Sequence, residues 1–383
     1  MTARPWLLLR GLRLPSVLAV PAPVLPRRRA RASVLAGLGF FALFTAVLNV
    51  ALDTVRPEWR DPEYGHRLKR LRSQADVAAG RPVVVALGSS RAQMGFSPSH
   101  LGLGDGPDAP IVFNFAVAGG GPVHEVLNLK RLLDNGVRPD CVLVEVLPPV
   151  LAGHSPAEKL ILPARLGVAD LERLAPYTED RGALYREWAW GRAVPFHTLR
   201  LYLMSHVSGG LLHWKSRQDF LWEQMKRDGW MPYFFPEVPA AKREQGIAEV
   251  HGQFAAYFPN YHIAPIPDRA YRDLLELCKT HGIRAAFYVM PESPAFRSWY
   301  PPGSRELAMQ YLAGLTREYG TPVFDASGWV PDPTAYADAH HLLRHGAEAF
   351  SARFGRECVG PWLRGSPAAN VTSGPRPLTP ELP

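Results

Sequence analysis

Five short apolar runs follow one another along the chain after residue 80. They are rich in β-branched residues and mostly continuous, with little alternation of apolar and polar positions. Strands that are buried on both faces of a parallel sheet have this pattern. We therefore predict buried strands at Pro82–Leu87, Ile111–Phe115, Cys141–Val146, Ala285–Val289 and Thr321–Phe324.

Helical periodicity lies between several of these runs. Residues 123–133, 268–281 and 305–319 each place apolar side chains at helical spacing, and each segment is followed by a glycine within a few residues. Glycine is the usual C-terminal stop of a helix. Strands that alternate with helices through short connections predict an α/β fold with a doubly wound parallel sheet.

Residues 150–265 interrupt this alternation. The segment is rich in Trp, Tyr, Phe, His and Pro and shows no series of strands. It is too long for a loop and too apolar for a disordered region. We predict a mainly helical insertion packed over the sheet, beside the carboxyl edge where ligand sites of α/β proteins lie.

A longer apolar run, Ser33–Leu52, contains twenty residues and no charge. This length is enough to cross the hydrocarbon layer of a membrane as a helix. Arginines crowd its N-terminal flank and acidic residues follow it, which predicts a cytoplasmic N-terminus and an extracytoplasmic body. A cleaved signal peptide and a buried core helix are the alternatives, but the run exceeds the usual signal length and no clear cleavage site follows.

The formal charge of +8 does not indicate nucleic-acid binding. Seven arginines and no acidic residue lie in residues 1–32, which leaves 36 basic and 35 acidic residues in the rest of the chain. A nearly neutral body lacks the positive surface that a phosphate backbone requires. The three cysteines form no zinc-ligand pattern with histidines, so the sequence gives no support for a metal or another cofactor.

Three polar motifs follow predicted strands or precede the last helix. Gly88-Ser89-Ser90 leaves the first strand, and Asn114-Phe-Ala-Val-Ala-Gly-Gly-Gly leaves the second. Asp338 and His341 stand three residues apart in a predicted loop, where a carboxylate can orient an imidazole as a general base. Each motif alone is common in turns and surface loops. Their order along one sheet instead indicates a serine nucleophile, an oxyanion-binding turn and an acid–base pair.

This ordered set resembles the SGNH (GDSL-like) hydrolase superfamily. Within it, the chain is most similar to the membrane-anchored branch that includes the alginate O-acetylation proteins and the D-alanyl-lipoteichoic acid transfer protein. The resemblance covers about residues 80–148 and 265–355. It implies a flavodoxin-like three-layer sheet, with Ser90 as nucleophile, His341 as general base and Asp338 as its orienting carboxylate. The oxyanion hole would use the backbone N–H groups of Ser90 and Gly119.

Two departures from the family pattern affect the predicted site. Ser89 replaces the usual Asp of G-D-S, as it does in the anchored relatives. The third-block G-x-N-D is absent, because Leu-Pro-Pro follows the strand that ends at Val146. One oxyanion donor is therefore missing unless Asn114 or another group supplies it, and losing such a donor typically costs about 10²–10³ in rate.

Each of the other candidate residues can be interpreted in two ways. Arg91 either binds a carboxylate of a polysaccharide or caps a turn, and Glu292 either bonds a sugar or caps the segment after the fourth strand. His340 is an alternative base, although the spacing to Asp338 favours His341. The aromatic residues of the insertion either stack on sugar rings or fill a core.

The resulting organisation assigns a role to each segment. We expect a cytoplasmic basic tail (1–32), a transmembrane helix (33–52), a juxtamembrane segment (53–80), the SGNH-like domain in two parts (81–149 and 266–363), the insertion (150–265) and a disordered tail (364–383).

The predicted function is that of an extracytoplasmic acyltransferase or esterase, anchored in the cell membrane by a single pass. Its substrate would be an acyl ester, such as O-acetyl, of a cell-surface or secreted glycan, with a membrane-bound acyltransferase as partner. One alternative is an inactive glycan-binding or scaffold protein of an export or acylation complex. Another is an intracellular soluble lipase or esterase, which requires residues 33–52 to be something other than an anchor.

Overall fold

A five-stranded sheet forms the centre of the computed structural model, which describes residues 27–77, 80–153, 163–213 and 216–365. All neighbouring strands are parallel, in the order β2-β1-β3-β4-β5. This is the flavodoxin-like strand order. The predicted fold class is confirmed, and the observed strands differ from the predicted ones by two residues or fewer at each end: β1 Val83–Leu87, β2 Ile111–Asn114, β3 Cys141–Glu145, β4 Arg284–Val289 and β5 Val323–Asp325.

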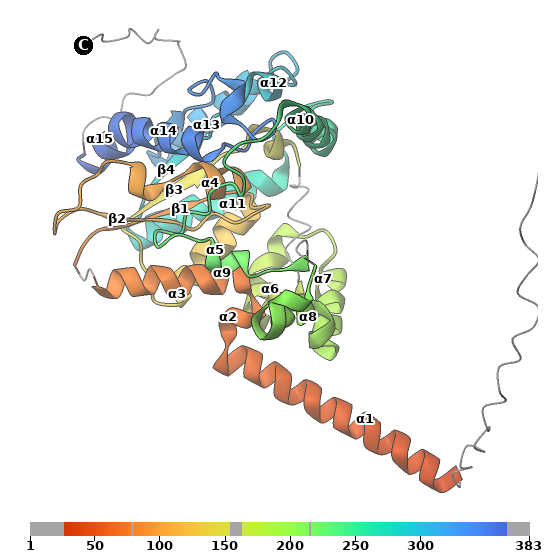
Figure 1. Cartoon of the computed structure of the whole chain (residues 1–383). Coiled ribbons are helices and arrows are strands. Elements are labelled where there is room, and N and C mark those ends of the chain that lie inside the picture. Colours follow the sequence, from red (N-terminus) through yellow and green to blue (C-terminus); the bar gives the residue numbers. More distant parts are fainter. Residues whose placement is uncertain (1–26, 78–79, 154–162, 214–215, 366–383) are drawn as a thin grey trace, which may run out of the picture. The chain divides into compact units, whose positions relative to one another are not determined.

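Helices cover both faces of the sheet, so the molecule has three layers (Figure 1). Alternate side chains of each strand point to opposite faces. Val85 and Leu87 of β1 face one apolar core, which is completed by α3 (Pro62–Val77), α5 (Pro122–Asp134), α11 (Pro265–His281) and α13 (Ser304–Tyr319). Val84 and Ala86 face the other, completed by α4 (Ser90–Gly95), α14 (Arg344–Phe354) and α15 (Gly360–Leu363). The near-absence of polar residues in the strands follows from this double coverage.

The three helices predicted from periodicity are present as α5, α11 and α13. Helices α11 and α13 end at Gly282 and Gly320, whose φ angles of 67° and 71° lie in the left-handed region. Side chains other than glycine rarely adopt this conformation, which explains the stop signals in the sequence. A short helix, α12 (Pro294–Arg297), follows β4.

The insertion is mainly helical, as predicted. It contains α6 (Val168–Leu174), α7 (Arg181–Ala193), α8 (Pro195–Ser208), α9 (Phe220–Glu223) and α10 (Ala240–Phe254). The segment after α9 covers the edge of the sheet, where the Asn114 N–H of β2 donates to the Asp228 carbonyl at 2.8 Å. Helix α10 packs against the loop that follows β5, because a Cβ on Gly246 would lie 3.0 Å from the Cβ of Asp338. The insertion therefore reaches the carboxyl edge of the sheet.

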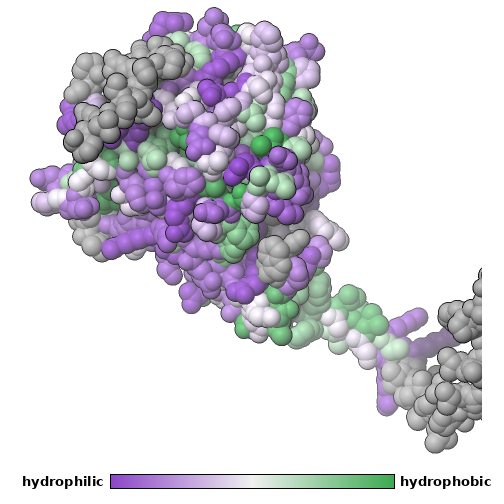
Figure 2. Space-filling view, turned by 45° about the horizontal axis from the view of Figure 1, so that its top comes forward, coloured by the Kyte–Doolittle hydropathy of each residue, from purple (hydrophilic) through white to green (hydrophobic). Residues whose placement is uncertain are grey.

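The N-terminal apolar run forms α1 (Arg27–Val50), followed by a π-helical turn at Ala51–Val55 and by α2 (Pro57–Arg60). Residues 27–55 are long and apolar enough to cross a membrane. Figure 2 shows apolar side chains along this helix and hydrophilic ones at its basic N-terminal end. Contacts divide the chain into two units, Met1–Leu48 and Asn49–Pro383. Most of the predicted basic tail (residues 1–26) and of the predicted disordered tail (366–383) lies outside the described residues.

Candidate functional site

Ser90 is the first residue of α4, directly beyond the carboxyl end of β1. Ser89 is the N-cap of this helix, and its hydroxyl oxygen accepts the Arg91 N–H at 3.2 Å. The Ser89 N–H and hydroxyl both donate to Oε2 of Glu145, at 2.7 and 2.8 Å. Glu145 ends the adjacent strand β3 and is buried. The turn that presents Ser90 is thus held by a carboxylate from the neighbouring strand.

Two glycines allow the turns after β1 and β2 to touch. A Cβ on Gly88 would lie 2.6 Å from Glu145 Oε2, and a Cβ on Gly120 would lie 2.3 Å from the Gly88 carbonyl oxygen. The two turns are also joined by a hydrogen bond from the Val117 N–H to that same carbonyl at 3.0 Å. Gly119, with a φ of 74°, stands at the bend of the second turn. The turn of the predicted oxyanion donor therefore packs against the turn of the predicted nucleophile.

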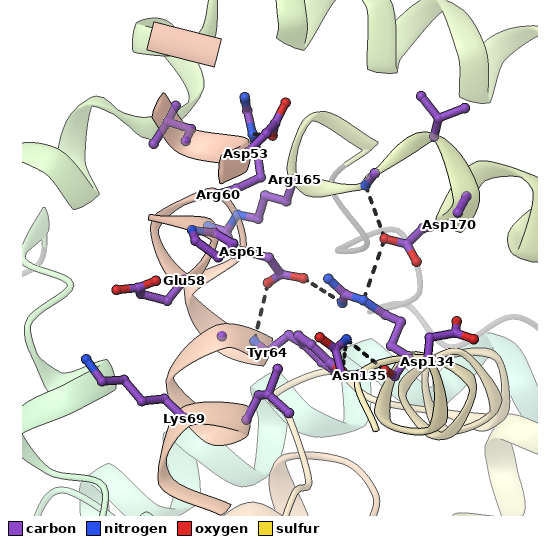
Figure 3. A pocket seen from close by; sticks show the side chains of 18 of the residues that line it. Asp53, Glu58, Arg60, Asp61, Tyr64, Lys69, Asp134, Asn135, Arg165 and Asp170 are labelled. Atoms are coloured by element: carbon purple, nitrogen blue, oxygen red, sulfur yellow. Dashed lines mark hydrogen bonds and ion pairs between the residues drawn. The ribbon is translucent and has the colours of Figure 1, made fainter. Parts of the chain in front are cut away.

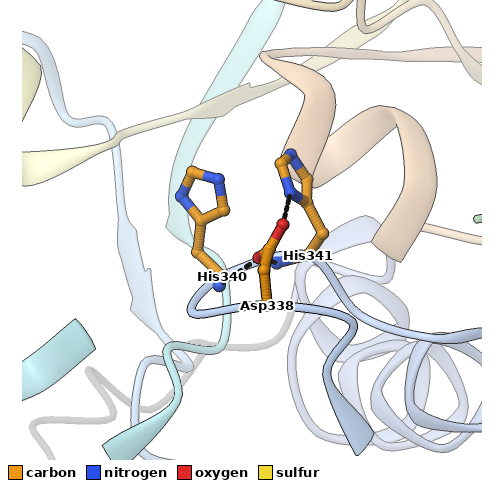
Figure 4. Close-up of side chains that lie close together, drawn as sticks. All are labelled: Asp338, His340 and His341. Carbon is orange, nitrogen blue, oxygen red and sulfur yellow. Dashed lines mark hydrogen bonds and ion pairs between the residues drawn. The ribbon is translucent and has the colours of Figure 1, made fainter. Parts of the chain in front are cut away.

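Asp338 and His341 lie in a tight loop between β5 and α14. An antiparallel bridge joins Tyr336 to Leu342, and the Ala337 N–H donates to the His341 carbonyl at 2.9 Å. Oδ1 of Asp338 accepts the backbone N–H groups of His340 and His341, at 2.8 and 2.9 Å. Oδ2 accepts from Nδ1 of the His341 ring at 2.7 Å (Figure 4). Every oxygen of this carboxylate is thus used to fix the loop or the ring.

Ser90, His341 and Asp338 form one hydrogen-bonded chain, although 251 residues separate the serine from the histidine. The Ser90 hydroxyl lies 2.8 Å from Nε2 of His341. A carboxylate only accepts hydrogen bonds, so the proton of the neutral imidazole is on Nδ1 and Nε2 is left to accept the serine proton. This is the arrangement that a serine nucleophile and its general base require. The His341 and Asp338 side chains are 17% and 13% exposed, so the chain of groups reaches the surface.

The surroundings keep Asp338 ionised. Burial raises the pKa of this carboxyl, but the facing His341 and the hydrogen bonds from His341 and His340 outweigh burial, and the pKa is lowered below its ordinary value. The pKa of His340 is lowered well below its ordinary value, first by burial and then by the neighbouring His341 side chain. His340 is therefore neutral at pH 7, beside a carboxylate that is ionised.

Arg91 lies beneath the site rather than in it. Its side chain has no exposed surface, and its guanidinium donates to the carbonyls of Met290 and Pro291 at 2.9 and 3.1 Å. Glu145 and Glu292 flank it, each with one oxygen 3.8 Å from a guanidinium nitrogen. The side chain is too buried to reach a glycan, so the first interpretation of Arg91 is wrong. From α4 it instead holds the segment that follows β4.

Glu292 belongs to the same buried cluster. It accepts from the Tyr300 hydroxyl at 2.8 Å and from Arg305 at 3.3 Å, and its side chain is fully buried. Burial raises the pKa of this carboxyl, against the lowering effect of Arg91 and Arg305. The structure thus places Glu292 in the support of the site, away from a position where it could bond a sugar.

Asn114 is also used internally. Its amide nitrogen donates to the carbonyls of Ala92 and Phe96 at 2.8 and 2.7 Å, and its oxygen accepts the Ala116 N–H at 3.0 Å. Both amide hydrogens hold α4 against β2. Asn114 consequently fixes α4 in place and has no side-chain N–H left for an oxyanion.

The His340 ring lies beside the His341 ring, with centroids 4.1 Å apart (Figure 4). Its ring packs against Phe254 of α10 and Phe296 of α12, and neither ring nitrogen has a hydrogen-bond partner among the described residues. Asp338, His340 and His341 each offer a ligand atom within 4.8 Å of the others, which suits a metal ion. A metal bound there would have to displace the bond between Asp338 and His341.

A groove beside the triad is built largely by the insertion. This cavity of about 550 Å³ is bordered by Asp338 and His341 on one side. Tyr233 and Phe235 line it, and the Tyr233 ring lies 6.5 Å from the His341 ring. Helix α10 contributes polar side chains, namely Lys242, Gln245, Glu249 and Gln253. The site thus combines an aromatic wall with several hydrogen-bonding groups.

Sequence reasoning missed Glu145 and the cluster around Arg91. The signal was present, because a glutamate at the end of a continuous apolar strand is unusual and needs a partner. The partner, an arginine four residues beyond the first strand, is also in the sequence, and parallel neighbouring strands bring the two together.

Residues 68–161 match the profile of a family described as a protein of unknown function, DUF1574. This match covers the first part of the sheet, including the nucleophile turn and Glu145. A search of curated proteins gives no match.

Proposed function

We propose that this protein is a membrane-anchored, SGNH-like serine acyltransferase or esterase that acts on acyl esters of a cell-surface or secreted glycan. The observation that carries the proposal is the hydrogen-bonded chain from Ser90 through His341 to Asp338, with distances of 2.8 and 2.7 Å. The strand order, and the contact between the turns of Ser90 and Gly119, support the same assignment.

The proposed reaction has two halves. Ser90 Oγ attacks the ester carbonyl carbon while His341 Nε2 takes the hydroxyl proton, and the backbone N–H groups of Ser90 and Gly119 stabilise the oxyanion. The ester C–O bond breaks, His341 returns the proton to the leaving alcohol, and an acyl-Ser90 remains. Water or a sugar hydroxyl then attacks this ester with His341 again as base, which releases the acid or a new ester and restores Ser90.

The groove supports a glycan as the alcohol component. Tyr233 and Phe235 offer flat faces for a sugar ring, and the polar side chains of α10 can bond its hydroxyl groups. The apolar length of residues 27–55 supports a membrane anchor. The arginines before it support a cytoplasmic N-terminus and an extracytoplasmic site. An acyl donor, such as an O-acetyl donor, would then reach the site through a membrane-bound acyltransferase partner.

A second candidate is an inactive glycan-binding or scaffold protein that keeps the same fold. One observation favours it: the amide of Asn114 is fully used, and Leu147-Pro148 follow β3 where a third oxyanion donor would stand. Two backbone donors would then have to stabilise the oxyanion alone.

The test is labelling of the full-length protein in detergent with a fluorophosphonate, read by intact mass, together with hydrolysis of 4-nitrophenyl acetate. We expect one adduct and measurable turnover, both lost in Ser90→Ala and His341→Ala. Ser298→Ala and His281→Ala change exposed residues outside the triad and serve as matched controls. A folded protein without label or turnover would refute catalysis and leave the scaffold function.

A further inference from the structure

A second cavity, of about 1010 Å³, lies far from the triad. It is lined by Asn49, Leu52 and Asp53 at the end of the apolar N-terminal helix, and by side chains from α2, α3, α5, α6 and α7 (Figure 3). None of the predicted site residues lines it. The charged residues that line it form two groups, which differ in how completely their positive and negative charges are paired.

In one part, acidic and basic groups neutralise each other. Asp61 accepts from Arg131 at 2.7 Å and from the Tyr64 N–H at 3.4 Å. Asp170 lies 3.6 Å from Arg131 and accepts from Arg173 at 2.8 Å. These paired charges form a closed network and leave little attraction for a further ion.

The other part contains three arginines, two of which share one carboxylate. Arg60 and Arg192 both bind Asp53, the one carboxylate in contact with them among the described residues. Arg165 lines the same cavity, and its charge also helps to lower the pKa of Asp61. One buried guanidinium nitrogen of each arginine has no hydrogen-bond partner in the described part of the chain: Nη1 of Arg60, Nε of Arg165 and Nε of Arg192. Arg60 itself is only 4% exposed.

The three arginines are therefore arranged for an anion. Burial lowers the pKa of Arg60, and the charge of Arg192 lowers it further, so the two guanidinium groups destabilise one another. A buried charged donor that has no acceptor destabilises the folded protein, and an added acceptor removes this cost. A bound anion with several oxygens satisfies both requirements, and arginine forks suit phosphate in particular.

The surroundings of the cavity identify the source of such an anion. Asn49 and Asp53 belong to the candidate membrane span of residues 27–55, and the Asn49 side chain donates to the Arg192 carbonyl of α7 at 2.8 Å. Helices α7 and α8 carry four arginines against one glutamate. They and the turn after them expose large apolar side chains: Trp190, Phe196, Val207 and Leu211. Basic residues combined with exposed aromatic and aliphatic ones are typical of helices that lie in a membrane interface.

We propose that this cavity binds the phosphate headgroup of an anionic membrane lipid, held by Arg60, Arg165 and Arg192. The inference rests on the proposed membrane anchoring but not on the proposed catalysis. A lipid bound here would fix the body of the protein against the surface from which its anchor emerges. The exposed apolar side chains of α7 and α8 would enter the interface beside it.

The test is native mass spectrometry of the full-length protein in a neutral detergent. We expect dioleoyl phosphatidylglycerol to bind. Dioleoylglycerol, which has the same acyl chains but no phosphate, should not bind. Removing one arginine–phosphate contact, by Arg165→Gln or Arg192→Gln, should weaken phosphatidylglycerol binding about tenfold. Arg186→Gln is the matched control, because this α7 arginine is 73% exposed and does not line the cavity.

Three outcomes would overturn the proposal: equal binding of both lipids, unchanged binding in both cavity variants, or binding of glycerol 3-phosphate as tight as that of phosphatidylglycerol. The last result would identify a site for soluble phosphate esters. Ser90→Ala separates this proposal from the catalytic one, since it should abolish fluorophosphonate labelling and leave lipid binding unchanged.

Discussion

Asp338→Asn is the most informative single substitution, because the structure determines which way the new amide must point. Oδ1 of Asp338 accepts two backbone N–H groups, from His340 and His341. In the variant, the amide oxygen has to occupy this position, since an NH₂ group there would face two donors. The NH₂ group is then directed at Nδ1 of His341, in the place of Oδ2.

An amide donor at that place reverses the tautomer of the histidine. Nδ1 has to accept, so the ring proton moves to Nε2, where it faces the Ser90 hydroxyl and cannot take its proton. The same substitution in serine-protease triads costs about 10⁴ in rate. We expect a loss of about 10³- to 10⁴-fold in kcat/KM, equivalent to about 4–5.5 kcal/mol of transition-state stabilisation.

The assay is hydrolysis of 4-nitrophenyl acetate by the full-length protein, with the urea midpoint measured in parallel to establish that the variant is folded. Asp332→Asn is the matched control, because the Asp332 side chain bonds Thr334 on an exposed turn outside the triad. If folded Asp338→Asn kept more than about a tenth of the activity, the serine would not depend on this tautomer. The role assigned to His341 would then be wrong.

Three further predictions concern the support of the site. Arg91→Leu leaves Glu145 and Glu292 without their buried partner and should lower the free energy of unfolding by about 3–5 kcal/mol in urea titrations, whereas Arg186→Leu should change it by no more than about 0.5 kcal/mol. Gly120→Ala places a Cβ 2.3 Å from the Gly88 carbonyl oxygen, and should lower the free energy of unfolding in urea titrations by about 1–3 kcal/mol and reduce turnover. Gly106→Ala adds a Cβ in open space and should change neither quantity. Because the pKa of Asp338 is lowered on folding, its contribution to stability is present above about pH 4 and is lost as the pH falls further. Urea titrations of Asp338→Asn between neutral and acidic pH should therefore show a smaller loss than those of the wild type; an equal loss would contradict the assignment.

The strands and the triad could be predicted from the sequence for related reasons. Strands buried on both faces leave continuous apolar runs, and their carboxyl ends meet at one edge of a parallel sheet. Residues that follow different strands, such as Ser90 and Gly119, are therefore brought together by topology alone. The spacing of Asp338 and His341 is short enough for local loop geometry to pair them.

Other features depend on contacts that no local pattern encodes. The sequence offers Arg91 only as a carboxylate-binding or turn-capping residue, whereas its charged partners come from β3 and from the segment after β4. The insertion has aromatic residues without a regular period, so its composition predicts helices but not which of them borders the triad. The arginine cavity combines segments from residue 49 to residue 192, and no single stretch of the chain shows it.

The buried cluster around Arg91 affects whether the site can work without a third oxyanion donor. The nucleophile turn is fixed through Ser89 to Glu145, Glu145 lies beside Arg91, and Asn114 holds the helix that follows. The end of β3 therefore contributes a support for the serine in place of a donor for the oxyanion. Donors that are rigidly placed stabilise developing charge without reorganisation, so two fixed backbone N–H groups retain most of their effect. A catalyst built this way should form the acyl-enzyme readily with an activated ester and discriminate against poor leaving groups. This behaviour would suit the proposed function, in which a membrane-bound partner delivers the acyl donor.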